Sequence, residues 1–427
     1  MSKTGQNLLI ISTNYIKTIK ATTLFVVFLF VHSWEQRKLG EVAFYRRGSF
    51  PQPYGKKEWY DGNGAMSFVQ VADVTDEMNL VENTKQKIST LAQPMSVYAD
   101  KNSVLVTLQG SIGRVAITQY GAFIDRTVLI FEKYKEPINI LFWAYIIKQK
   151  FIEEAHKAPG GTIKTITKEA LSDFDLLLPK YDEQSRVGTF FKQLDNLITL
   201  HQRKYDKLVA VKKSLLEKMF PADGETVPKI RFKGFSDAWE QRKFGETVQI
   251  ERGGSPRPID DFITTAPDGL NWVKIGDAPE QGNYITKTAE KIKPSGLSKT
   301  REVHPNDLIL SNSMSFGKPY IMAINGCIHD GWLLIRDNQE RFDLKFLCHL
   351  LGTAQMLSQY KSMAAGSTVN NLNKELVGNT TITFPTKQEQ QKIGKSFELL
   401  DNLITLHQRQ LEKLKNIKSA LLDKMFV

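Results

Sequence analysis

The chain has 427 residues, long enough for two or three domains that each bury their own core. Its composition, 41% hydrophobic and 24% charged, excludes a disordered chain. The net charge of +11 favours a polyanionic partner, either nucleic acid or an anionic membrane surface, although a basic surface without a specific partner is also consistent with it. The two cysteines, Cys327 and Cys348, form no CxxC pair, which argues against a disulfide framework or zinc site and predicts a reducing, cytoplasmic setting.

Residues 1–33 form a leader unlike the rest of the chain. In it, an apolar run of eight residues, Leu24–Val31, follows Lys17 and Lys20. Eight residues are too few to cross a bilayer, which takes about 20. The run is not followed by the small-residue cleavage site of a signal peptide. We therefore expect neither a membrane anchor nor a secreted protein.

The rest of the chain is a tandem duplication. The segment WEQRKLGE at Trp34 returns as WEQRKFGE at Trp239, an offset of 205 residues (239 − 34). The segment DNLITLHQR at Asp195 returns at Asp401, an offset of 206 residues (401 − 195). Between these copies the two halves share little. Two matching frames around two dissimilar inserts indicate one scaffold that carries two specificities.

Each half predicts a mixed α/β domain followed by a long helix. In the inserts Gly48–Lys157 and Gly253–Lys361, short β-rich runs alternate with turns that contain glycine and asparagine. A helix is expected at Ile138–Lys157 and at Leu344–Met363, because glycines follow both, and each domain ends in a strand that stops at a proline. The predicted segments are the leader at 1–33, mixed α/β domains at 34–180 and 239–385, long helices at 181–220 and 386–427, and a linker at 221–238.

The two long helices carry matching heptad seams, with a period of 3.5 residues. Paired antiparallel, the seams match every apolar layer, and their polar positions meet as His201 with Lys418 and Lys212 with His407. Polar layers fix the register, because a slip would bury them against leucine. This pairing predicts an antiparallel coiled coil with pseudo-two-fold symmetry, whose 26-residue seams are about 39 Å long, close to one turn of B-DNA. The seam residues are Leu194, Ile198, His201, Tyr205, Leu208, Lys212, Leu215 and Met219 with Leu400, Ile404, His407, Leu411, Leu414, Lys418, Leu421 and Met425.

The starts of the long helices lie outside this seam. A T-x-x-E pattern that ends at Glu389 predicts a capping box for the second helix. Phe191 and Phe397 continue the seams beyond the paired segment. We therefore expect them, with Val187 and Ile393, to pack on their own domain or on a partner protein.

Several motifs recur in both halves: the WEQRK start, a GGT or GST turn after the helix, a strand that ends in proline, the EQ pairs at Glu183 and Glu389, and the DNLITLHQR helix. Together they cover 34–427 and resemble the specificity subunit of type I restriction-modification enzymes. One departure is that only the second half is entered through VPKIRFKGFSDAW.

The resemblance implies two target-recognition domains, each reading one half of a bipartite sequence in double-stranded DNA. It implies that the paired helices bind two methyltransferase subunits, and that restriction subunits join for cleavage. It also implies that S-adenosylmethionine, ATP and Mg²⁺ belong to those partners, so that this chain holds no cofactor or metal.

Two other functions are open to test. An enzyme with its own methyltransferase or nuclease activity needs motifs that are missing, since the chain has no Asn-Pro-Pro-Tyr or Asn-Pro-Pro-Phe tetrapeptide and no GxxxxGK[ST] phosphate loop. The pattern at Gly110–Arg114 is typical of a tight turn, and Asp260–Asp261 lacks the partner motif of a nuclease. A coiled-coil interaction protein explains the helices, but not two dissimilar inserts in a basic chain. A non-catalytic DNA-specificity subunit explains both.

DNA binding needs donors for phosphates, and amide, hydroxyl or guanidinium groups for base edges. Three pairs of loops, in matching positions of the two halves, carry such groups. Their recurrence favours a binding role over that of ordinary solvated turns. The candidates are Arg46, Arg47 and Ser49 with Arg252, Ser255 and Arg257; Gln109, Ser111 and Arg114 with Asn312, Ser313 and Lys318; and Thr162 and Lys164 with Thr368, Asn370 and Asn371.

Overall fold

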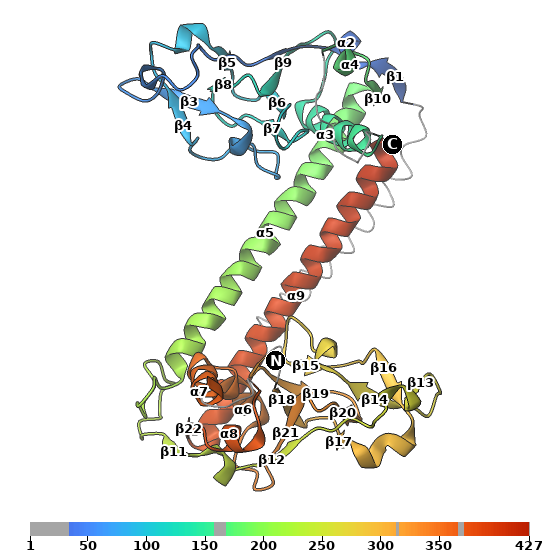
Figure 1. Ribbon diagram of the computed structural model, residues 1–427. Helices are drawn as coiled ribbons and strands as arrows, with labels where there is room; N and C mark the ends of the chain where they lie inside the picture. The colour runs from blue at the N-terminus through green and yellow to red at the C-terminus, as the bar shows by residue number, and fades with distance from the viewer. Residues whose placement is uncertain (1–33, 158–167, 313–315, 366–370, 427) are drawn as a thin grey trace. The chain divides into compact units, whose positions relative to one another are not determined.

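The computed structural model describes residues 34–157, 168–312, 316–365 and 371–426, and its contacts separate two compact units (Figure 1). The first unit takes the described residues up to Thr199 and from Lys413 onward, and the second takes Leu200–Glu412. Each unit contains one mixed α/β domain and a part of each long helix. Among the helices of the described ranges, none has both the length and the apolar content that a membrane span requires.

In the first unit, a domain of short strands is followed by the start of a long helix. Two four-stranded sheets have the orders β2-β9-β6-β7 and β4-β3-β8-β5, and β1 pairs with β10. The elements are β1 (Glu35–Lys38), α2 (Leu39–Val42), β2 (Ala43–Arg47), β3 (Met66–Val69), β4 (Gln86–Ile88), β5 (Val97–Ala99), β6 (Val104–Thr107), β7 (Val115–Ile117), β8 (Ala122–Ile124), β9 (Val128–Tyr134), α3 (Ile140–Lys157), α4 (Lys168–Ser172), β10 (Asp175–Leu178) and α5 (Tyr181–Met219).

The domain of the second unit repeats this plan with five strands in each sheet, in the orders β12-β21-β18-β19-β15 and β13-β16-β14-β20-β17, and β11 pairs with β22. The elements are β11 (Glu240–Lys243), β12 (Gln249–Arg252), β13 (Ile263–Thr264), β14 (Leu270–Val273), β15 (Tyr284–Ile285), β16 (Glu290–Ile292), β17 (Arg301–Val303), β18 (Leu308–Ser311), β19 (Pro319–Met322), β20 (Gly326–Ile328), β21 (Trp332–Arg336), α6 (Leu344–Leu351), α7 (Ala354–Ala365), α8 (Lys374–Gly378), β22 (Thr381–Phe384) and α9 (Lys387–Phe426).

Several short turns connect the two sheets of each domain, and one of them lies at an equivalent place in both. In the first domain β8 belongs to one sheet and β9 to the other, and Asp125–Thr127 connects them. In the second domain His329–Gly331 connects β20 to β21 in the same way. We call these two segments the joining turns. They occupy equivalent places, although their sequences differ.

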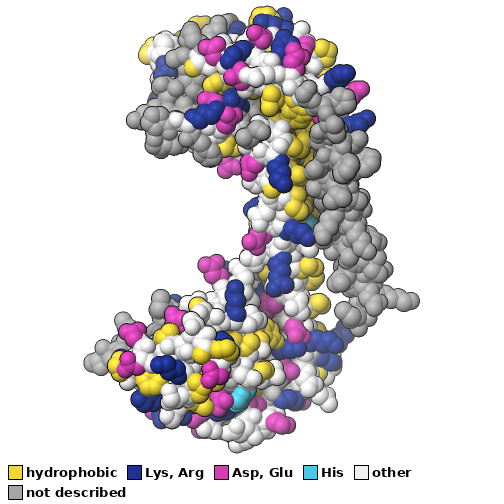
Figure 2. Space-filling model, turned by 90° about the vertical axis from the view of Figure 1, so that its right-hand side faces the viewer, with side chains coloured by type: hydrophobic (Ala, Val, Ile, Leu, Met, Phe, Trp, Pro, Cys, Tyr) yellow, Lys and Arg dark blue, Asp and Glu magenta, His cyan; other side chains and the backbone are white. Residues whose placement is uncertain are grey.

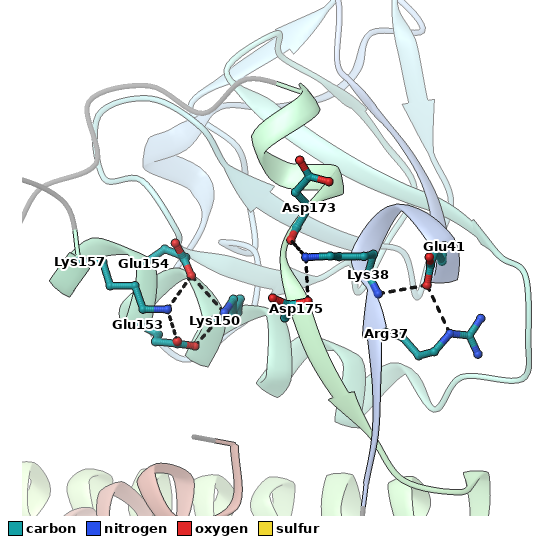
Figure 3. Close-up of polar contacts among 9 residues, drawn as sticks. All are labelled: Arg37, Lys38, Glu41, Lys150, Glu153, Glu154, Lys157, Asp173 and Asp175. Atoms are coloured by element: carbon teal, nitrogen blue, oxygen red, sulfur yellow. Dashed lines mark hydrogen bonds and ion pairs between the residues drawn. The ribbon is translucent and has the colours of Figure 1, made fainter.

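The duplicated WEQRK segments form the same frame in both units. In the first, β1 pairs antiparallel with β10, and Lys38 Nζ lies 2.8 Å from Asp175 Oδ1 and 2.9 Å from the carbonyl oxygen of Asp173 (Figure 3). In the second, β11 pairs with β22, and Lys243 Nζ donates to the carbonyl oxygen of Asn379 at 2.9 Å. In each unit, this lysine therefore connects the first strand of the frame to the segment just before the last strand.

The aromatic residues expected to pack beyond the seam do pack on their own domain. Phe191 is fully buried, and its ring lies 5.2 Å from that of Tyr145 in α3, which crosses the start of α5 (Figure 1). Phe397 is fully buried as well, 4.9 Å from the ring of His349. Their neighbours Val187 and Ile393 belong to the same two cores. The prediction is confirmed for both helices.

Two local predictions were wrong. The helix expected at Leu344–Met363 is interrupted, because Gly352 ends α6 and the Thr353 hydroxyl donates to the carbonyl oxygen of Leu350. Arg46, Arg47 and Arg252 were assigned to loops but belong to strands, the first two to β2, which pairs with β9, and the third to β12, which pairs with β21.

Candidate nucleic-acid interface

A glycine brings the loop after the second strand of each frame against the joining turn. A Cβ on Gly48 would lie 2.2 Å from the carbonyl oxygen of Ile124, and one on Gly253 would lie 2.2 Å from that of His329. Real Cβ atoms do not approach backbone oxygens this closely, so both positions require glycine. The loop and the turn therefore form one surface in each domain.

In the first domain this surface is organised around Asp125, which is buried. Its carboxylate accepts hydrogen bonds from the Tyr54 hydroxyl at 2.8 Å and from the backbone N–H of Thr127 at 2.9 Å. Gln70 Nε2 donates to the same Tyr54 hydroxyl at 2.7 Å. Arg126 is exposed, with its guanidinium 5.5 Å from the centre of the Tyr54 ring. The turn thus presents a guanidinium on a fixed aromatic support.

In the second domain the equivalent turn carries an acidic group. Asp330 Oδ1 accepts a hydrogen bond from the Ser255 hydroxyl at 3.0 Å and lies 2.9 Å from His329 Nε2, while Oδ2 lies 3.6 Å from the Arg257 guanidinium. The backbone carbonyl of Asp330 accepts hydrogen bonds from Asn312 Nδ2 at 2.8 Å and Arg252 Nε at 3.3 Å. Four candidates, three of them from 252–257 and the fourth Asn312, therefore converge on one residue that the sequence did not single out.

The remaining described candidates are mostly held by the protein itself. Arg46 Nε lies 2.5 Å from Glu132, and Arg114 Nε lies 3.0 Å from Asp76. The Ser49 hydroxyl donates to a carbonyl oxygen at 3.2 Å, as does the Lys318 ammonium.

Other candidates differ in exposure. Asn312 is buried, so its side chain supports the turn, whereas Gln109, Ser111 and Asn371 are exposed. Arg47 is exposed at the end of β2. Thr162, Lys164, Ser313, Thr368 and Asn370 lie outside the described residues.

The joining turns were missed because no motif marks them. A usable signal was present: the apolar strand that ends at Ile124 and the one that ends at Ile328 are each followed by polar residues, and another apolar strand comes next. The net charge of the chain does not indicate the position of the joining turns either. Lys and Arg side chains are interspersed with Asp and Glu over both α/β domains in Figure 2, so the excess positive charge is not gathered on one part of that view.

An aspartate connects each domain to both long helices. In the first aspartate cluster, Asp195 of α5 lies 2.5 Å from Lys418 Nζ of α9 and accepts a hydrogen bond from the Tyr145 hydroxyl of α3 at 2.6 Å. The burial of Tyr145, with the nearby charge of Asp195, raises the pKa of the phenol above its usual range, so it stays a donor.

The second aspartate cluster repeats this contact with a different ring. Asp401 of α9 lies 2.5 Å from Lys212 Nζ of α5 and 3.5 Å from His349 Nε2 of α6, and it accepts a hydrogen bond from Asn283 Nδ2 at 3.3 Å. Burial, with the nearby charge of Lys212, lowers the pKa of His349 to about 3. The imidazole is therefore neutral at physiological pH.

These contacts make the long helices antiparallel within each unit but correct their predicted register. Lys418 meets Asp195 rather than His201, and Lys212 meets Asp401 rather than His407. His201 instead meets His407, with their Nδ1 atoms 3.0 Å apart. The physical reason is charge. The predicted layers placed each lysine opposite a histidine, while the observed register gives each lysine a carboxylate.

The expected capping box is also replaced by an ion pair. Glu389 is fully buried, and its two carboxylate oxygens lie 2.7 and 2.8 Å from Arg231 of the linker. In the first unit, Glu183 occupies the equivalent position and accepts a hydrogen bond from Trp34 Nε1 at 2.9 Å. The EQ motif therefore anchors the entry to each frame rather than capping a helix.

Comparison with known proteins identifies the scaffold. The model of the type I restriction modification DNA specificity domain matches this chain twice, at residues 32–210 and 236–416. The chain belongs to the type I restriction-modification DNA specificity family. As members of this family are specificity subunits, the chain is a DNA-recognition subunit and not a catalyst.

Relatives span nearly the whole length of this specificity subunit. The MjaVIII type I restriction enzyme specificity subunit of Methanocaldococcus jannaschii is 20% identical over 415 residues, which is 91% of both chains. The MjaIX specificity subunit of the same organism is 21% identical over 420 residues, 92% of both.

Solved structures share the fold. The S subunit of a type I restriction-modification system from M. genitalium gives a TM-score of 0.57 at 16% identity, covering 93% of this chain and 98% of that one. A chain from a structure on complex assembly and conformational transition of the type I system gives 0.52 at 18% identity, covering 92% and 97%.

Proposed function

We propose that each recognition domain reads one half of a bipartite sequence in double-stranded DNA. The observation that carries this proposal is that the two frames share equivalent residues, whereas the two joining turns do not. The lysine of the frame and the aspartate cluster recur in both units with equivalent residues. The joining turns occupy equivalent places, yet one presents Arg126 and the other Asp330. Equivalent places with different chemistry are what two different half-sites require.

We further propose that the paired long helices set the gap between the half-sites. Helix α5 has 39 residues and α9 has 40, which corresponds to about 60 Å each. The lysine of one helix binds the aspartate of the other in both units. Contacts of this kind keep the two helices in one register, so helix length translates into spacing.

Two methyltransferase subunits are proposed to dock on the long helices, and restriction subunits to join them. In the second unit, the helices leave large apolar side chains partly exposed, including Leu200, Val209 and Leu399. Catalysis, with S-adenosylmethionine, ATP and Mg²⁺, is proposed to belong to those partners, and the complex to act on DNA in the cytoplasm. Replacement of Leu399 with Glu should reduce co-purification of the methyltransferase, while Lys395→Glu, an exposed position on the same helix, serves as the control.

A domain exchange tests the reading of half-sites. Residues 48–157 would be replaced with the chain's own 253–361, and methylated bases would be mapped in cells that carry the partner subunits. The expected result is a target with two copies of the second half-site. A foreign recognition domain at 48–157 should change the first half-site alone. If either exchange altered the second half-site, the proposed division of labour would be wrong.

A paired insertion tests the spacing. One heptad would be added between His201 and Lys212, and one between Asp401 and His407, so that all three observed contacts across the helices are kept. This adds about 10 Å of helix, or roughly three base pairs. The gap should lengthen while base identity stays the same. An unchanged gap in an active complex contradicts the spacer role.

Salt dependence separates DNA recognition from a purely protein-binding role. If lysine and arginine side chains neutralise DNA phosphates, the logarithm of the binding constant falls steeply and linearly with the logarithm of salt concentration. A methyl-transfer assay on the isolated chain tests the enzymatic alternative, and we expect no transfer without the methyltransferase subunits.

A further inference from the structure

We propose that the joining turns read DNA bases, through Arg126 in the first domain and, in the second, through Asp330 together with Arg257 of the loop that packs against the turn. This inference deepens the proposed function and rests on it, because it names the residues by which each domain would select its half-site. It differs from the loops suggested by sequence, in which neither Arg126 nor Asp330 was included.

The second joining turn is both held in place and open to solvent. Ser255 and His329 hold one oxygen of the Asp330 carboxylate, and 30% of that side chain is exposed. Arg257 is 80% exposed and lies 3.6 Å from the other oxygen, a distance beyond a strong hydrogen bond. Its guanidinium can therefore leave this loose contact for a ligand without exposing a buried charge.

The chemistry of this pair suits base edges. A carboxylate accepts hydrogen bonds from the amino groups of cytosine or adenine, and a guanidinium donates two to guanine. Because the turn and the loop beside it position an acceptor next to a donor, together they can discriminate base pairs by their hydrogen-bond pattern and not only by charge. A surface that contacts phosphates alone would gain nothing from Asp330, whose charge repels the DNA backbone.

The first joining turn offers a different pattern from the same place. Arg126 is exposed, and among the described residues its contact is the face of the Tyr54 ring. Tyr54 is fixed by hydrogen bonds with Asp125 and Gln70. A planar guanidinium on a fixed ring is preorganised for a bidentate pair of hydrogen bonds to guanine. The acidic group here is buried, so this domain presents a donor where the other presents an acceptor.

The other cationic candidates have partners that favour a structural or phosphate-binding role. Arg46 and Arg114 are paired with Glu132 and Asp76, so a base contact would break an ion pair. Arg252 Nε donates to the backbone of the turn itself. These residues can support the turn or bind the DNA backbone, while base selection falls to the turn.

The test measures discrimination by the assembled complex with its methyltransferase subunits. Binding would be measured for a duplex with the natural target and for duplexes in which each base pair of a half-site is replaced in turn. The variants are R126A, R257A and D330A, with R37A and R242A as controls from frame strands β1 and β11. Methylated bases would be mapped in cells for the same set.

R126A should relax discrimination at one position of the first half-site by about tenfold to a hundredfold, and leave the second half-site unchanged. R257A and D330A should relax discrimination in the second half-site and leave the first unchanged. The two controls should retain full discrimination at both. A uniform loss of affinity across all duplexes would overturn the inference, since it is the signature of phosphate contacts. So would unchanged discrimination in all three variants.

Failure of the proposed function gives a different result. In that case the unaltered complex itself would show no preference among the duplexes, and no variant would be informative. If D330A disrupted the fold of the turn, D330N would keep its shape while exchanging one acceptor for a donor. That variant should then change which base pair is preferred rather than abolish binding.

Discussion

The two units place an aspartate, a lysine and a ring in the same arrangement, yet one ring is a phenol and the other an imidazole. Tyr145 donates a hydrogen bond to Asp195 at 2.6 Å, whereas His349 lies 3.5 Å from Asp401. The aspartate and the lysine come from the duplicated helices, and the ring comes from the variable domain. The shared part of the contact is therefore fixed by the scaffold, and each domain supplies its own way of binding to it.

The entries to the two frames differ in a second way. Glu389 binds Arg231 of the linker, while Glu183 binds the indole N–H of Trp34. The arginine lies in the VPKIRFKGF segment that only the second half possesses. The carboxylate of Glu389 thus binds a charged guanidinium, whereas that of Glu183 binds a neutral N–H donor. Four predictions follow from these differences, and the largest effect is expected at the buried ion pair.

Arg231→Met should destabilise the second unit by about 3–5 kcal/mol, because it leaves the fully buried carboxylate of Glu389 without its partner. Hydrogen exchange of the first turns of α9 and of the linker, followed across a denaturant series, measures the loss. Lys233→Met, at an exposed position of the same linker, is the control and should change stability by less than about 0.5 kcal/mol. Equal effects of the two substitutions would show that the ion pair contributes little.

Removing the lysine of either aspartate cluster should cost about 1.5–3 kcal/mol at neutral pH, the value of a hydrogen bond to a charged group. The two clusters should then diverge as pH falls. In Lys212→Met, burial still lowers the pKa of His349, but the further lowering by the Lys212 charge is gone. His349 can then more readily become the cation beside Asp401, so the cost should shrink toward pH 5. In Lys418→Met it should stay constant, because Tyr145 gains no charge. Urea unfolding of both variants at several pH values measures the two costs. If both costs had the same pH dependence, His349 would not be acting as the substitute cation.

The second unit alone should lose stability through His349 in acid. Its pKa in the folded chain is about 3, below the value of about 6.5 in an unfolded chain. The stability is therefore complete above pH 6.5 and is lost as pH falls below it, by about 2 kcal/mol at pH 5. His349→Gln should remove this component. An NMR titration in which His349 takes up its proton near pH 6.5 would disprove the burial argument.

The smallest effect is expected at the indole of the first unit. Trp34→Phe removes the hydrogen bond to Glu183, which is partly exposed and can bind water instead, so the loss beyond packing should be about 1 kcal/mol. Trp239→Phe is the matched control, because Trp239 Nε1 has no hydrogen-bond partner among the described residues. Thermal unfolding of the two variants gives the difference. A larger loss for Trp239→Phe would contradict it.

By itself, the sequence determined the duplication, the mixed α/β class and the antiparallel direction of the long helices. Periodicity and proline stops are local signals, so α5 and α9 lie within a residue or two of where they were expected. The packing of Phe191 and Phe397 also followed from the seam, because their apolar faces extend beyond it and must be covered.

Only the tertiary structure decided the register of those helices and the residues that meet at the joining turns. Apolar periodicity places the two lysines on the seams, but it does not decide which residues of the other helix they meet. The choice depends on Asp195 and Asp401, which lie beside the seam and become partners of lysine only when the two helices are brought together. Asp330 likewise gathers side chains from two separate segments, 252–257 and Asn312, and their proximity is a property of the folded sheets rather than of any stretch of chain.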